Sequence, residues 1–144
     1  MKVLGYGRIK LGSGELAPRL GTLSRRLEDL IAEHSPEVAA LEALYHGVNT
    51  KSLIVLAQAR GALIATLARQ GIPIGEYAPA EVKAAVTGSG RADKAQVERM
   101  VRLILGLGGK SLEADASDAL AVAICYAQRL RFDRLDGRQG ISGT

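Results

Sequence analysis

Apolar residues recur with helical spacing in the first part of the chain, between residues 16 and 34. The stripe consists of Leu20, Leu23, Leu27, Leu30 and Ile31. A period near 3.6 residues is typical of an amphipathic helix, because it places the apolar side chains on one face and the charged ones opposite. Pro36 follows at a position that ends such a helix. We therefore expect a helix over residues 16–34.

Breaker residues and apolar runs predict the remaining elements. Residues 1–14 are glycine-rich and β-like, with strand positions at Val3, Leu4, Ile9 and Leu11. We expect a buried strand at residues 38–41 and a second strand that ends near Tyr77. The expected later helices span residues 50–70, 79–87, 93–105 and 114–131. Alternating strands and helices indicate an α/β domain over residues 1–131, followed by a disordered basic tail over residues 132–144.

Composition narrows the class of protein. The chain has 144 residues, of which 47% are hydrophobic and 24% charged, as in soluble globular proteins. Its net charge of +4 permits an anionic partner such as nucleic acid without requiring one. The single cysteine, Cys125, excludes an internal disulfide and fits a reducing cytoplasm. Gln58 and Arg60 interrupt the most apolar run, which favours a core helix over a membrane span, and we expect no secretion signal.

Three acids stand where hydrolytic chemistry is common in α/β folds. Glu42 follows the strand at residues 38–41, and ligands bind at such carboxyl ends of strands. Asp115 and Asp118 are three residues apart at a helix start, so they share one side of the helix. Phosphodiester hydrolases use carboxylate clusters of this kind to hold two divalent metal ions, and hard oxygen ligands suit Mg²⁺.

The same residues have plainer explanations. Aspartates in the first turn of a helix usually cap it or compensate its dipole. An acid after a strand, such as Glu42, is usually a solvated loop residue. The spacing alone leaves both explanations open.

Three longer segments resemble the RuvC family of Holliday-junction resolvases. The first is LEALYHGVNTKS at residues 41–52, continued by LAQARG at 56–61. The second is YAPAEVKAAVTG at 77–88, followed by GRADKAQV at 90–97. The third is ADASDALAVAI at 114–124. They occur in the family's order and, with the preceding helix, extend the resemblance over about residues 8–128.

The resemblance implies an RNase H-like fold, with a central mixed sheet flanked by helices. It also implies a bacterial, cytoplasmic homodimer that nicks four-way DNA junctions in pairs during recombination and repair. Each site would use two Mg²⁺ ions, with Mn²⁺ as an alternative. Glu42, Asp115 and Asp118 match three of the family's four metal-binding carboxylates. Association with a branch-migration helicase is implied by family alone.

The resemblance also indicates residues that contact DNA. Tyr45 falls where the family places an aromatic side chain that stacks on a base near the junction centre. Lys83 and Lys94 match lysines near the DNA backbone, and Lys94 would also stabilise phosphate charge during catalysis. Further candidates for phosphate contact are Asn49, Lys51 and Arg91. Outside the family context, a half-buried loop tyrosine and solvated lysines are the ordinary explanations.

The chain departs from the family at its N-terminal end. The family opens with an apolar strand that ends in Gly-Ile-Asp-Pro-Gly or close to it, and this aspartate is the fourth carboxylate, bridging the two metals. Here MKVLG is followed directly by YGRIK, and residues 1–14 contain no Asp or Glu. Residues 6–11 instead resemble the family's third strand, so the N-terminal strands are expected to be incomplete. Either the protein carries an internal deletion, or a segment of it is missing from this sequence.

Three functions are compatible with these observations. The first is a metal-dependent endonuclease that resolves junctions. The second is a catalytically inactive protein that binds junctions but lacks the first-strand aspartate needed to cut them. The third is an unrelated α/β interaction protein, which would require three collinear matches to be coincidence.

Overall fold

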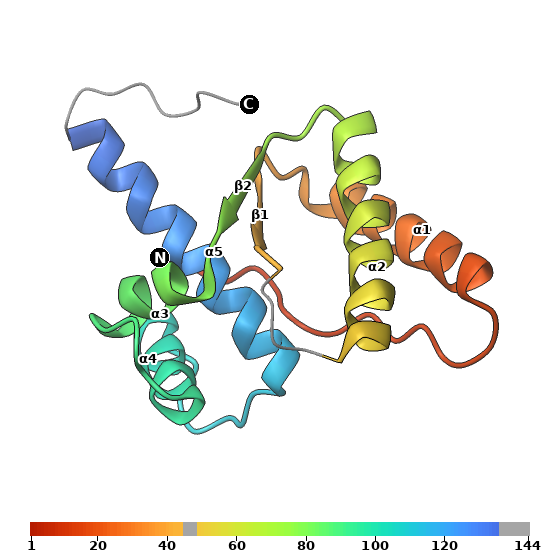
Figure 1. Cartoon of the computed structure of the whole chain (residues 1–144). Helices are drawn as coiled ribbons and strands as arrows, with labels where there is room; N and C mark the ends of the chain where they lie inside the picture. Colours follow the sequence, from red (N-terminus) through yellow and green to blue (C-terminus); the bar gives the residue numbers. More distant parts are fainter. Residues whose placement is uncertain (45–48, 136–144) are drawn as a thin grey trace. The chain divides into compact units, whose positions relative to one another are not determined.

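The computed structural model describes residues 1–44 and 49–135. In chain order the elements are α1 (Leu16–His34), β1 (Ala39–Glu42), α2 (Thr50–Arg69), β2 (Ile74–Tyr77), α3 (Pro79–Thr87), α4 (Lys94–Leu105) and α5 (Ala114–Leu135) (Figure 1). They form two compact units. The first unit contains Met1–Arg8, Ala40–Ala43 and the chain from Glu76 onward, and the second contains Ile9–Ala39 and Leu44–Gly75.

The first unit is built around α5, which packs against α3 and α4. Its largest fully buried aliphatic side chains are Val101 on α4 and Ile124 on α5, which are 0% and 1% exposed. Tyr77, at the end of β2, joins the same core, and its ring meets the Tyr126 ring edge-on at 6.2 Å between centroids. The apolar core of this unit therefore holds α5 from Ala116 to Cys125, a segment that begins one residue after Asp115 and includes Asp118.

Local sequence determines where α3 and α4 begin. Pro79 occupies the first turn of α3, where its missing N–H costs nothing, and the Glu81 carboxylate accepts a hydrogen bond from the Ala78 N–H at 2.8 Å. A capping box formed by Asp93 and Gln96 starts α4. Asp93 accepts from the Gln96 N–H at 2.8 Å, and the Gln96 side chain accepts from the Asp93 N–H at 2.9 Å. These caps fix the start of α4, where Lys94 lies.

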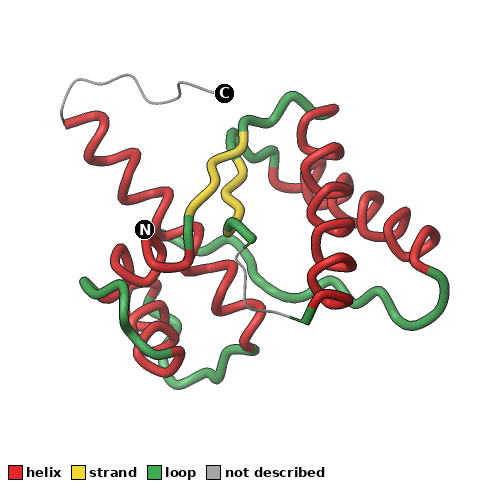
Figure 2. The backbone as a smooth tube through the Cα atoms, in the orientation of Figure 1, coloured by secondary structure: helices red, strands yellow, loops and turns green. Residues whose placement is uncertain are grey.

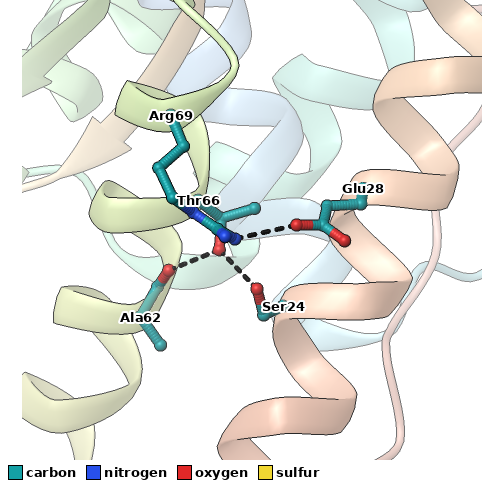
Figure 3. A network of polar contacts seen from close by, with 5 residues as sticks. All are labelled: Ser24, Glu28, Ala62, Thr66 and Arg69. Carbon is teal, nitrogen blue, oxygen red and sulfur yellow. Dashed lines mark hydrogen bonds and ion pairs between the residues drawn. The ribbon is translucent and has the colours of Figure 1, made fainter.

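In the second unit, α1 and α2 pack side by side and share a polar network (Figure 3). The buried Thr66 hydroxyl donates to the Ala62 carbonyl at 2.7 Å and lies 2.7 Å from the Ser24 hydroxyl. Nearer the C-terminal end of α2, Arg69 pairs with Glu28 of α1 at 2.8 Å. The contacts satisfy a buried hydroxyl on α2 and a half-buried one on α1, which fixes the register of the two helices.

Helix α2 is much more exposed than the sequence predicts. Among the described helices it is the one with the length and apolar composition needed to cross a membrane, yet only 11% of its 18-residue window is buried. Its buried residues are Thr66 and Leu67, whereas Ile54, Val55 and Leu56 are all exposed. The expectation of a core helix is therefore wrong, because among the described residues of its unit α1 is the helix that packs along it.

The two strands pair in parallel. The Ala39 N–H donates to the Pro73 carbonyl and the Ala43 N–H to the Tyr77 carbonyl, so both partners advance by four residues in the same direction. The sheet has the order β1-β2 in the part of the chain that is described. Strand β1 ends at Glu42, one residue later than predicted, so this acid is the last residue of the strand.

The predicted strand positions Val3, Leu4, Ile9 and Leu11 are not in a strand; the segment is loop up to α1 (Figure 2). A strand needs a neighbouring strand for its backbone hydrogen bonds, and in the part of the chain that is described the sheet consists of β1 and β2. Val3 nevertheless packs against the core of the first unit.

Helix α5 continues to Leu135, so it is longer than the predicted 114–131 span. The predicted tail boundary at residue 132 therefore falls inside a helix, where Phe132 and Leu135 are exposed. The extension consists of Phe132, Asp133, Arg134 and Leu135, of which arginine and leucine are good helix formers, and it contains neither glycine nor proline. The rest of the predicted tail, residues 136–144, lies outside the described residues.

Candidate active site

The three candidate acids belong to the first unit. Glu42 is at the carboxyl end of β1, and Asp115 and Asp118 lie in the first turns of α5. All three residues are exposed, so each carboxylate is accessible from solvent. Acids at a helix N-terminus are stabilised by the positive end of the helix dipole, which accounts for this location independently of any metal.

Glu42 shares an electrostatic neighbourhood with three of the other predicted residues. Partial burial raises the pKa of the Glu42 carboxyl, and the negative charge of Asp118 raises it further. The positive charges of Lys83 and Lys94 act in the opposite direction and lower that pKa. The fold therefore brings together an acidic pair and two lysines from β1, α3, α4 and α5.

The raised pKa has a consequence for stability. A carboxyl whose pKa is higher in the folded state is stabilising when protonated, and this contribution is lost as the pH rises through the folded pKa. We expect Glu42→Gln to be more stable than the wild type at pH 7, by roughly 0.5 kcal/mol or less because the residue is exposed. The difference should shrink as the pH falls towards 4.5, the ordinary value for this carboxyl.

Urea denaturation at several pH values measures this effect. Glu37→Gln is the matched control, since Glu37 is an exposed acid outside the cluster. A stability gain that is equal for both variants, or independent of pH, would contradict the assigned environment of Glu42.

Asp115 forms an ion pair with Arg8, a residue that the sequence analysis did not identify. Arg8 lies with its Nε 3.1 Å from Glu113 Oε2 and its Nη1 3.8 Å from Asp115 Oδ2. Its guanidinium therefore lies between two carboxylates at the start of α5. The sequence contained no signal for this contact, because Arg8 is more than one hundred residues from its partners.

These residues do not fit a two-metal centre. Such a centre needs several carboxylates around two ions about 3.5–4 Å apart. Among the described residues, no group of three or more His, Cys, Asp or Glu side chains is arranged to hold a metal ion. Asp115 is paired with Arg8, and residues 1–14 contribute no acid. Glu42 and Asp118 remain as a pair of carboxylates beside two lysines.

The predicted DNA-contacting residues are divided between the two units. In the first unit, Lys83 is half-buried on α3, and both Arg91 and Lys94 are exposed at the start of α4. In the second unit, Asn49 caps α2 by accepting from the Lys51 N–H at 2.9 Å, which gives this asparagine a structural role. Lys51 is exposed in the first turn of α2. Tyr45 lies outside the described residues.

Comparison with known protein families identifies the family of this chain. Residues 1–126 match the family model described as "Crossover junction endodeoxyribonuclease RuvC". The chain belongs to the RuvC family. The predicted resemblance is thus confirmed over most of the chain, and coincidence between the three collinear segments is excluded as an explanation.

Individual RuvC proteins show how far the likeness extends. The chain is 43% identical to RuvC of Chlorobaculum parvum over 145 aligned positions, which cover 100% of this chain and 76% of that protein. It is 42% identical to RuvC of Marinobacter nauticus over 142 positions, covering 96% of this chain and 81% of that one. About a quarter of the first protein and a fifth of the second have no counterpart here.

Two solved RuvC structures confirm the RNase H-like fold class. The Thermus thermophilus RuvC structure has a TM-score of 0.76 at 30% identity, covering 83% of this chain and 72% of that one. The same protein in complex with its Holliday junction substrate has a TM-score of 0.78 with the same identity and coverage. The α/β prediction is therefore correct, although the N-terminal strands inferred for residues 1–14 are not formed.

Proposed function

We propose that this chain recognises four-way DNA junctions and takes part in their resolution by phosphodiester hydrolysis, during recombination and repair. The observation that carries the proposal is the RuvC family match over residues 1–126. It is supported by the likeness to a relative that was solved with its Holliday junction substrate. An exposed acidic pair beside two lysines is chemically suited to a phosphate-bearing substrate, because lysines offset backbone charge near the reacting group.

The family implies a divalent metal ion for the hydrolysis, and we propose Mg²⁺, with Mn²⁺ as an alternative. Glu42 and Asp118 would be its ligands, since Mg²⁺ is commonly held by one or two carboxylates together with substrate phosphates. Lys94 would stabilise phosphate charge, and Lys83 would contact the backbone. In this assignment Asp115 is a third ligand only when Arg8 leaves it.

A second candidate is a junction-binding protein that does not cut. It is favoured by two specific observations: residues 1–14 provide no carboxylate, and a guanidinium is paired with Asp115. Both candidates predict recognition of branched DNA, so binding and cutting must be measured separately.

Binding is tested with a synthetic four-way junction and a linear duplex of the same length, in Ca²⁺ to prevent cutting. We expect the junction to bind more tightly, with an affinity that falls steeply with salt because phosphate contacts dominate. Lys83→Gln and Lys94→Gln should each weaken binding and lower the salt slope by about one. Lys110→Gln, an exposed lysine outside the cluster, is the control. Equal affinity for duplex and junction would contradict both candidates.

We also propose that the chain forms a homodimer through the exposed apolar surface of α2. Ile54, Val55 and Leu56 are 54%, 46% and 48% exposed, and clustered apolar side chains of this size are favoured at protein interfaces. A second copy of the chain is the proposed occupant because the family resemblance implies a dimer.

Val55→Lys should weaken this dimer at least about tenfold, since burying one valine side chain contributes about 1.5–3 kcal/mol. Sedimentation equilibrium measures the dissociation constant. Leu103→Lys places the same charge on an exposed apolar position of α4 and should leave association unchanged. A wild-type chain that remains monomeric at high concentration would contradict the proposal.

We propose a bacterial cytoplasmic location, supported by the relatives' organisms and by a single, buried cysteine that suits a reducing compartment. Association with a branch-migration helicase follows from the family resemblance alone.

A further inference from the structure

We propose that Thr87, the last residue of α3, is a positioning residue that sets the spacing between Lys83 and Lys94 for the phosphates of a DNA junction. The inference rests on the proposed function, because it takes both lysines to contact DNA. Thr87 acts through these two lysines and through the turn between them, residues 88–93.

The Thr87 hydroxyl links α3 to this turn. Its Oγ1 lies 2.8 Å from the Lys83 carbonyl oxygen and 3.0 Å from the Ser89 carbonyl oxygen, so the hydroxyl can donate to either one. The same Oγ1 accepts a hydrogen bond from the Ser89 N–H at 3.2 Å. One side chain therefore contacts both the backbone of Lys83 and the backbone of the turn.

The turn leads from this contact to Lys94. The Ser89 side chain accepts a hydrogen bond from the Arg91 N–H at 3.3 Å, and the Ser89 carbonyl accepts one from the Ala92 N–H at 3.3 Å. The capping box at Asp93 then starts α4, whose first residue is Lys94. Hydrogen bonds therefore connect the end of α3 to the start of α4.

A close contact also holds the turn against the first turn of α3. A Cβ atom at Gly90 would lie 3.3 Å from the Ala80 carbonyl oxygen and 3.6 Å from the Ala80 Cβ. Pro79 and the Glu81 carboxylate fix this part of the helix, so the Ala80 carbonyl has little freedom to move away. Together with the Thr87 hydroxyl, this contact determines where the turn lies on α3.

The two lysines that the turn connects act at the same place. The charges of Lys83 and Lys94 both reach the Glu42 carboxylate and lower its pKa. Lys83 is half-buried on α3, whereas Lys94 is exposed at the start of α4. Phosphate contacts fix the register of a protein on DNA, so two lysines contribute together only when their separation matches that of the phosphates. The turn should therefore affect affinity for the junction.

The experiment measures the affinity of the full chain for a synthetic four-way junction in Ca²⁺, at one fixed salt concentration. Thr87→Val removes the hydroxyl and nearly keeps the shape of the side chain, so we expect about three- to ten-fold weaker binding. Thr87→Ser keeps the hydroxyl and should stay within about two-fold of the wild type. Thr22→Val is the matched control, since the Thr22 hydroxyl also donates to the carbonyl four residues earlier but lies on α1.

A double-mutant cycle separates positioning from a loss of stability. If Thr87 acts through the spacing of the lysines, Thr87→Val should change affinity by less than about two-fold in a Lys94→Gln background. A purely structural residue would weaken binding equally in both backgrounds. Gly90→Ala disturbs the same turn and should weaken binding in the same way. Gly109→Ala, at a glycine with open space around it, should not.

Three results would overturn the inference: wild-type affinity in Thr87→Val, an equal loss in Thr22→Val, or an equal loss in both Lys94 backgrounds. In each case a wild-type preference for junction over duplex leaves the proposed function intact. A wild-type chain without that preference contradicts the proposed function, and this inference with it. Circular dichroism verifies that each variant is folded. If Thr87→Val does not fold, the same cycle with Gly90→Ala decides.

Discussion

Given a synthetic four-way junction and Mg²⁺, this chain should nick the DNA at most about one-thousandth as fast as Thermus thermophilus RuvC. Metal ions stabilise the transition state of such reactions by several kcal/mol, and each 1.36 kcal/mol corresponds to a factor of ten in rate. The carboxylates of the described residues do not form a two-metal centre, since residues 1–14 contain no acid and Arg8 is paired with Asp115. The expected result is junction binding with little or no cutting.

The measurement is single-turnover nicking of labelled junction, with Ca²⁺ in place of Mg²⁺ as the control. Asp118→Asn serves as a second control, because it should abolish any residual cutting and retain binding. Symmetric, Mg²⁺-dependent cuts at the rate of the Thermus protein would contradict the prediction. They would mean that an acid outside residues 1–14 completes the site, or that a segment is missing from this sequence.

The second large effect concerns the core of the first unit. Ile124→Ala should lower the free energy of unfolding by about 2–5 kcal/mol, because it removes buried methylene and methyl groups and leaves a cavity. Ile124 is 1% exposed in the middle of α5, where the packing leaves little room to relax. A loss of this size is a large part of the 5–15 kcal/mol that is typical of whole domains.

Urea denaturation followed by circular dichroism gives this value. Leu103→Ala is the matched control, since Leu103 is 72% exposed on α4 and should change stability by no more than about 0.5 kcal/mol. Similar losses in both variants would contradict the burial assigned to Ile124.

Sequence reasoning succeeded where structure depends on near neighbours. The capping box at Asp93 and the proline at the start of α3 act within four residues, so both helix starts were predictable. The acids could be assigned by family pattern, and the structure places Asp118 within electrostatic range of Glu42. The helix starts depend on neighbouring residues, and the acids lie in recognisable sequence motifs, so both could be predicted from the sequence.

Features that depend on distant partners were not predictable. The strand expected at Val3 failed because strand formation depends on a pairing partner and not on local composition. Arg8 meets Asp115 across most of the chain length, and no spacing rule connects them. The exposure of α2 depends on how little of its surface α1 covers. The hydrophobic pattern of α2 itself gives no information about that coverage.

Helix α5 has a graded local stability along its length. At 1.5 Å per residue its 22 residues extend for about 33 Å, but its buried positions end at Cys125. Beyond that point Tyr126 and Arg129 contact Tyr77, and the final turn, with the exposed Leu135, has no core beneath it. Backbone amides near Leu120 should therefore exchange slowly with solvent and those of the last turn quickly. Fraying is confined to the end of the helix opposite Asp115 and Asp118, so those acids are carried by its more rigid half.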